Sequence, residues 1–217
     1  MSICFTIADA DWALTKDVFS VIGTLVSAVG VGLVAWVGFS GLATWRQQTK
    51  GTSDHDLARR LLIDLYRLRD AIGHVRNPLI LASEGGPEER DAKLSFPQIS
   101  YRSTVRAYEQ RFSVVDEVRR RLDTSLIESE AVWDTTVKKL FGRIFNLQHE
   151  LFINIRTYLV TLNPDERDQR VEACTKILEK RREVMYGFFD DSDDPFKADL
   201  DAALSKIEDY LRPKLIR

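Results

Sequence analysis

An uncharged run in the first quarter of the chain constrains the fold more than any other feature. Residues 18–45 contain no Asp, Glu, Lys or Arg, and they are bounded by Asp17 and Arg46. A bilayer core of about 30 Å is crossed by roughly 20 helical residues, so a run of this length spans it with room for tilt. No other uncharged stretch approaches this length, and we expect a single transmembrane helix over 18–45.

The alternative explanation of this run is a secretory signal peptide. Such a peptide has a basic start and an apolar region of only about 7–15 residues. The present chain instead begins with Asp9, Asp11 and Asp17 against a single Lys16, and its apolar run is much longer. We therefore expect an anchor that is retained in the mature protein.

The charges that flank the run predict its orientation. The first basic residues after it are Arg46, Lys50, Arg59 and Arg60. Basic residues next to a span stay on the cytoplasmic side, and tryptophans such as Trp12 and Trp45 anchor span ends at the interface. We expect a single-pass protein of a bacterial-type inner (plasma) membrane, with residues 1–17 extracytoplasmic and residues 46–217 cytoplasmic.

Small residues line one side of the expected span. A 3-4-3 spacing places four of them on one helical stripe: Ser20, Gly23, Ser27 and Gly30. Small residues let helix backbones approach closely within lipid, so the stripe predicts a homo-oligomer that associates through the span. Ordinary membrane-helix composition is the alternative explanation. A pore is less favoured than plain packing, because no ionisable residue in the span marks a conduction path.

The sequence of the expected cytoplasmic part predicts an all-α bundle of about five helices, because apolar residues recur there every three or four positions. In the first stretch they are Leu57, Leu61, Leu65, Leu68, Ile72 and Val75. In the second they are Val105, Tyr108, Phe112, Val115, Val118 and Leu122. In the third, expected as one helix over 128–162, they are Trp133, Val137, Leu140, Ile144, Leu147, Leu151, Ile155 and Tyr158.

Capping and proline signals predict the helix boundaries. Ser53 is an expected N-cap, and Asn77-Pro78 ends the first helix before a loop over 78–98. Asn163-Pro164 is the start signal of a fourth helix that ends near Gly187. A last helix is expected from Asp194-Pro195 to about Leu211.

Charge and motifs exclude several function classes. Only Lys16 among the 31 basic residues, and Asp9, Asp11 and Asp17 among the 33 acidic ones, precede residue 46, which leaves the cytoplasmic part neutral. No long-range field therefore attracts polyanions to it. The chain has no phosphate-binding Gly loop, G-x-S-x-G or H-E-x-x-H motif and no paired-carboxylate signature, and we expect no cofactor.

The two cysteines give no site. Cys4 and Cys174 lie in no C-x-x-C motif and have no histidines at ligand spacing, so we expect no metal. A membrane between them would also exclude a disulfide.

Three local charge patterns have a structural and a functional interpretation. The acidic run 190–194 predicts a helix-capping loop more readily than a calcium site, because it lacks the Gly and Glu positions of an EF-hand. The clusters 119–121 and 180–182 are more readily explained as solvated helix faces than as surfaces that contact RNA or anionic lipid. Arg76 is expected to pair with Glu84 and pin the loop that follows it.

One motif carries candidate chemistry, R-[NDH]-x-x-x-H, present as Arg69, Asp70 and His74. It resembles the motif of HEPN-domain ribonucleases, which are small helical bundles of bacterial immune systems. The resemblance implies metal-independent RNA cleavage, with His74 as general acid or base, Arg69 stabilising phosphate charge and Asp70 orienting the pair. It also implies an active site between two protomers. A second pair, Arg143 and His149, has Ile144 at the polar position.

Two functional hypotheses follow. The first is a membrane-anchored helical interaction or effector protein without enzymatic activity, which self-associates through its span and bundle and perturbs the membrane in anti-phage defence. Its layout is similar to that of a membrane-anchored accessory protein of RNA-targeting CRISPR systems. The second is a HEPN-like ribonuclease held at the inner membrane, for which RNA would be the substrate.

Overall fold

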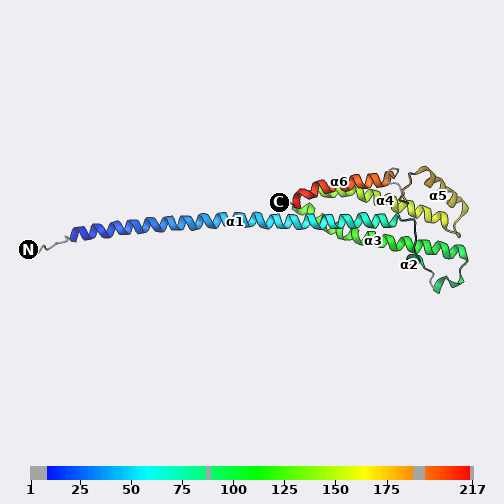
Figure 1. Ribbon diagram of the computed structural model, residues 1–217, viewed down its shortest axis with the longest axis horizontal. Coiled ribbons are helices and arrows are strands. Elements are labelled where there is room, and N and C mark those ends of the chain that lie inside the picture. Colours follow the sequence, from blue (N-terminus) through cyan, green and yellow to red (C-terminus); the bar gives the residue numbers. More distant parts are fainter. Residues whose placement is uncertain (1–8, 87–88, 188–193, 216–217) are drawn as a thin grey trace, which may run out of the picture. The chain divides into compact units, whose positions relative to one another are not determined.

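The computed structural model describes the backbone of residues 9–86, 89–187 and 194–215. Every regular element in these ranges is a helix, which confirms the predicted all-α class (Figure 1). The side chains of residues 9–15, 40–44, 46–50 and 89–90 lie outside the description. By its internal contacts the chain divides into two units, Met1–Ser53 and Asp54–Arg217.

The first helix, α1, runs from Asp9 to Val75 and contributes to both units. The predicted helix start at Ser53 is therefore wrong, since Ser53 lies inside α1. Residues 46–53 contain no proline, and their one glycine, Gly51, costs a helix only about 1 kcal/mol relative to alanine. The apolar part of α1, Lys16–Phe39, is long enough to cross a membrane.

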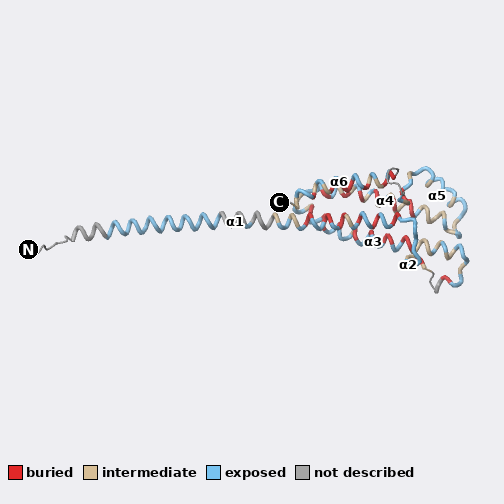
Figure 2. Tube along the Cα trace, in the orientation of Figure 1, coloured by how far each residue is buried: buried red, intermediate tan, exposed pale blue. Residues whose placement is uncertain are grey.

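The second unit has a core built by four helices. These are the end of α1, α3 (Phe96–Val132), α4 (Thr136–Leu162) and α6 (Pro195–Leu215). α4 packs directly against both α3 and α6. In Figure 2 the buried positions recur at intervals along each of these helices.

The predicted apolar stripes are largely the observed core. All six positions of the first stripe, Leu57 to Val75, are almost completely buried. The second and third stripes also face the core, with partial exposure at Val105, Trp133, Leu140 and Tyr158. Apolar spacing therefore predicts the sides of the helices correctly, because burial requires one apolar face for each helix.

The predicted helix 128–162 is wrong at its start. α3 continues to Val132, and α4 begins only at Thr136. The side chain of Asp134 accepts the backbone N–H of Thr136 at 2.6 Å. Such a local bond competes with helix continuation, and it turns the chain between the two helices.

The predicted loop 78–98 contains two short helices. α2 covers Ala82–Gly85, and a 3-10 turn covers Glu89–Lys93. α2 packs against α3, and a Cβ at Gly85 would overlap the carbonyl oxygen of Ser103. Only glycine lets the two backbones come so close.

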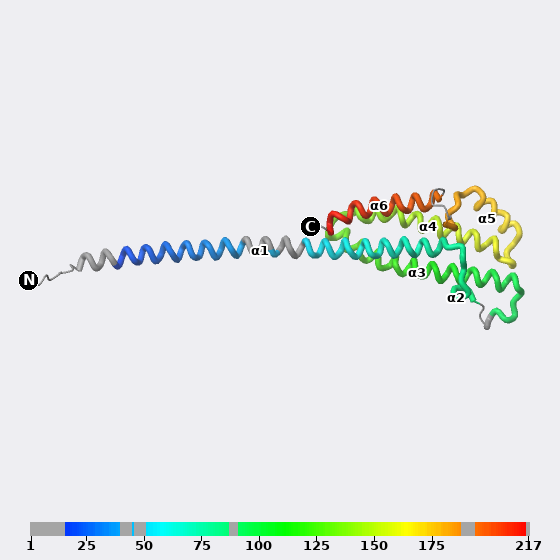
Figure 3. The backbone as a smooth tube through the Cα atoms, viewed as in Figure 1, coloured from blue at the N-terminus to red at the C-terminus, as the bar shows by residue number. Residues whose placement is uncertain are grey.

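The predicted helix 163–187 is shorter in the structure. Asn163 accepts the N–H of Asp165 at 3.1 Å and forms a turn, so that α5 spans only Asp168–Lys180. Figure 3 traces the chain from α4 through α5 to α6. α6 in turn passes the predicted end at Leu211 and includes Pro213 in its last turns. A proline there removes only one helical hydrogen bond.

Candidate functional site

The apolar part of α1 has the most unusual environment in the chain. None of the hydrophobic window within Lys16–Phe39 is buried by other residues of the protein. Large side chains such as Phe19, Val26 and Val34 are more than half exposed. Each large aliphatic or aromatic side chain left in water costs about 1.5–3 kcal/mol relative to burial. The helix is thus long and apolar enough to cross a membrane, and its apolar window is not buried.

The small residues of this segment lie open on its surface. Apart from the neighbouring residues and the backbone of the helix itself, no described atom lies within 4 Å of the position that a Cβ would occupy at Gly23 or Gly30. The hydroxyl of Thr24 donates to the carbonyl oxygen of Ser20 at 2.9 Å, so this polar group is satisfied within the helix. Another helix could approach the backbone of this face without steric hindrance.

The residues of the ribonuclease-like motif take part in separate pairs. Arg69 donates to its neighbour Asp70 at 2.9 Å on the exposed side of α1. His74 lies near the end of α1, and its Nε2 is 3.0 Å from a carboxylate oxygen of Glu84. Among the described residues, no hydrogen bond or ion pair joins Arg69 or Asp70 to His74. Catalysis by these three residues stays a prediction.

Glu84 belongs to a buried charge network that the sequence analysis missed. Its main partner is Arg111 of α3, whose side chain is only 1% exposed. The guanidinium contacts both carboxylate oxygens and also donates to the carbonyl oxygens of Asn77 and Leu79. The hydrogen bond from Arg111 lowers the pKa of Glu84 to about 2. Arg111 therefore fixes the segment after α1 onto α3.

The predicted pairing of Arg76 with Glu84 is wrong. The Arg76 guanidinium instead donates to the carbonyl oxygens of Val184 and Tyr186 and to the carboxylate of Asp194. It also lies over the ring of Phe196, 4.6 Å from its centre. The backbone N–H of Met185 donates to the side chain of Glu183 and that of Gly187 to the carbonyl oxygen of Arg76, so these groups make no helical bonds.

Asp194 supports the helix-cap interpretation of the acidic run. Its side chain accepts the backbone N–H of Lys197 at 3.0 Å, at the start of α6. The other acidic residues of the run, at 190, 191 and 193, lie outside the described residues. Within the described part of the chain, no group of three or more His, Cys, Asp or Glu side chains is arranged to hold a metal ion.

The two basic clusters do not form continuous charged surfaces. Arg119 stacks on Phe145 with its guanidinium carbon 3.3 Å from the ring centre, whereas Arg120 faces solvent. Arg182 pairs with Glu150 and Asp199, while Lys180 and Arg181 are exposed. These ion pairs raise the pKa of Arg182 and lower that of Asp199.

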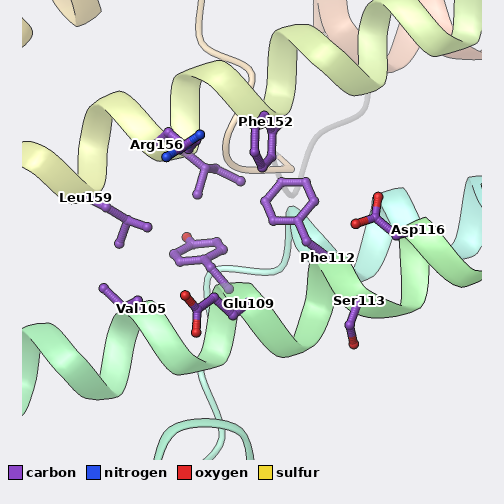
Figure 4. Close-up of a pocket in the computed structure, with 10 residues that line it drawn as sticks. Val105, Glu109, Phe112, Ser113, Asp116, Phe152, Arg156 and Leu159 are labelled. Carbon is purple, nitrogen blue, oxygen red and sulfur yellow. The ribbon is translucent and has the colours of Figure 1, made fainter.

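An open groove runs between the beginning of α3 and the end of α4. It has a volume of about 340 Å³, and Figure 4 shows side chains from both helices turned into it. Phe112 and Phe152 meet edge to face at its centre, 5.2 Å apart. A smaller opening of about 190 Å³ adjoins it and includes His149, whereas Arg143 pairs with Asp199 on α6. Among the described residues, no hydrogen bond or ion pair joins Arg143 to His149 either.

The groove combines an apolar interior with charged edges. Val105, Ile155 and Leu159 contribute aliphatic surface beside the two phenylalanines. Glu109 and Asp116 lie two helical turns apart on the α3 edge. In the described structure neither carboxylate forms an ion pair, while Arg156, whose guanidinium carbon lies 5.4 Å from the ring centre of Phe152, lines the groove from α4.

No protein-family model, curated protein or solved structure matches this chain. The geometry of the chain is therefore the sole basis for a proposal of function.

Proposed function

We propose that this protein is a membrane-anchored helical interaction protein that self-associates through its span and its bundle. The observation that carries the proposal is the uncovered apolar helix Lys16–Phe39. A lipid bilayer satisfies such a helix fully, because its backbone bonds are internal and its side chains are apolar.

The flanking charges support the proposed orientation. Acidic residues dominate before the span, and basic residues such as Arg46 and Lys50 follow it. The bundle is then cytoplasmic, at the inner membrane of a bacterial-type cell.

The open face at Gly23 and Gly30 supports association within the membrane. Helices in lipid associate by close packing rather than by the hydrophobic effect, and small residues permit that packing. The stripe Ser20, Gly23, Ser27 and Gly30 offers such a face, and a second copy of the same helix is the partner always present beside it.

Energy transfer between two labelled populations of the full chain in liposomes tests the proposal. We expect transfer at low protein-to-lipid ratio, and we expect Gly23→Leu or Ser27→Leu to reduce it strongly by separating the backbones. Gly32→Leu is the matched control, because it adds the same bulk about 160° around the helix from the mean direction of the stripe.

Two results would contradict the proposal. The first is a full chain that alkaline carbonate removes from the membrane. The second is transfer that responds equally to Gly23→Leu and Gly32→Leu, or that responds to neither.

A further inference from the structure

Helix α5 is the least integrated helix of the second unit. It packs against α4, yet none of its residues is fully buried. Val171, Cys174 and Leu178, spaced three and four residues apart, are half-buried and make its inner stripe. A second stripe, Ala173, Ile177 and Lys180, lies on a different side of the helix and is exposed.

The exposed stripe of α5 ends in positive charge. Ile177 is 43% exposed, and Lys180 and Arg181 follow it at the end of the helix. In the described structure these two cations have no acidic partner. The surface is thus an aliphatic projection beside two free positive charges.

The groove between α3 and α4 has the complementary properties. Its aromatic and aliphatic interior can take an aliphatic side chain. Its α3 edge carries the carboxylates of Glu109 and Asp116, which outnumber the one cation, Arg156, on the α4 edge. α5 of the same chain contributes no residue to this groove. The chain therefore carries two complementary surfaces, and within one copy they do not contact each other.

We propose that α5 of one copy docks into the α3–α4 groove of a second copy, with Ile177 against Phe112 and Phe152 and with Lys180 and Arg181 against Glu109 and Asp116. The occupant of the groove is thus a second copy of this chain. The inference rests on the proposed self-association and identifies its cytoplasmic surface.

The arrangement of the two surfaces agrees with two-fold pairing. α4 supplies one wall of the groove and also supports α5, so both surfaces belong to the same part of the bundle. In a two-fold dimer each α5 enters the partner's groove, and the contact is made twice. Anchoring in one membrane favours it further, because tethered chains have a high effective concentration.

Cysteine cross-linking of the full chain in liposomes tests the pairing. In a Cys4→Ser, Cys174→Ser background, Ser113→Cys at the groove and Ala173→Cys on α5 are expected to form a disulfide between copies. Ala202→Cys, at an exposed position of α6, replaces Ala173→Cys in the matched control and is expected to cross-link about tenfold less.

Charge-reversal variants provide the second and decisive part of the cross-linking experiment. Lys180→Glu with Arg181→Glu is expected to lower cross-linking about tenfold, because like charges then face each other. Adding Glu109→Lys with Asp116→Lys is expected to restore it. Three results would each overturn the docking. They are equal cross-linking in the Ala202→Cys control, unchanged cross-linking after the Lys180→Glu and Arg181→Glu reversal, and cross-linking that Glu109→Lys with Asp116→Lys does not restore.

The energy-transfer assay on the span separates the two proposals. If transfer still depends on Gly23 while the cross-links fail, the docking of α5 is wrong and association through the span stands. If transfer is absent and the cross-links fail as well, both proposals are overturned.

Discussion

Arg111 shows how a single residue organises the connection between two helices. Its charge is buried, yet it contacts a carboxylate and the carbonyl oxygens of Asn77 and Leu79. A buried charge is tolerated only when its hydrogen bonds are satisfied, and loss of one partner leaves the others uncompensated.

We expect Arg111→Met to reduce the free energy of unfolding by about 3–5 kcal/mol, as for other broken buried ion pairs. Chemical denaturation of the full chain in detergent, followed by circular dichroism, measures this loss. Arg121→Met is the control, because Arg121 is exposed and its ion pair within the described part of the chain is with Glu117, one turn away. Similar losses for the two variants would contradict the role assigned to Arg111.

The same network predicts that the stability of the fold depends on pH. The folded pKa of Glu84, about 2, lies below its ordinary value of 4.5. The ionised Glu84 therefore stabilises the fold fully above pH 4.5, and this stabilisation is lost as the pH falls toward 2. Glu84→Gln removes this contribution, so its stability difference from the original chain should shrink over this range. A stability difference that stays constant as the pH falls would contradict the stabilising role assigned to ionised Glu84.

His74 distinguishes the interaction protein from the ribonuclease. It is half-exposed, and its buried partner Glu84 keeps its main contacts, those with Arg111, when the imidazole is removed. We expect His74→Ala to change stability by less than about 1 kcal/mol and to leave self-association intact. Metal-free incubation of the full chain with RNA provides the opposing test. Cleavage that disappears in His74→Ala would establish the ribonuclease instead.

A comparison of the apolar core residues with the buried arginines shows which contacts the sequence does not predict. Leu57 and Leu61 are predicted correctly, because an apolar side chain at helical spacing has one favourable environment. Arg76 and Arg111 are ordinary surface residues by type, and only the fold brings their distant partners to them. Asp194 lies 118 positions from Arg76, and no local pattern connects the two.

At the scale of elements, α5 differs most from its neighbours. It has no buried residue, whereas α4 buries seven, so local opening should cost less free energy in α5. We expect amides of 168–180 to exchange with deuterium much faster than those of 141–155 in monomers diluted into detergent. Mass spectrometry of the two peptides measures this. Equal protection in the monomer would contradict the weak packing of α5.

Helix boundaries were harder to predict than helix faces. The faces follow from repeated apolar positions, and many residues support each of them. A boundary depends on one or two local bonds, such as the contact between Asp134 and Thr136, or on a distant group such as the carbonyl oxygen of Arg76 at Gly187. Ser53 has the right residue type for a cap, but the helix continues through it.

At the scale of the molecule, the two units present different surfaces. The second unit is a helical bundle with a buried apolar core, and its sequence predicted that class well. The apolar part of the first unit has no cover within the chain, and this contrast was already visible as the absence of charge over 18–45. The groove and the exposed stripe of α5 were not predictable, because each depends on how the helices of the bundle pack.

Protease treatment of carbonate-washed, inverted inner-membrane vesicles that carry the full chain tests the central claim most directly. The account predicts that the chain stays with the membrane pellet and that the bundle, residues 54–217, is digested from the exposed cytoplasmic face. Release of the intact chain into the carbonate supernatant, or a bundle that stays protected until detergent is added, would contradict it.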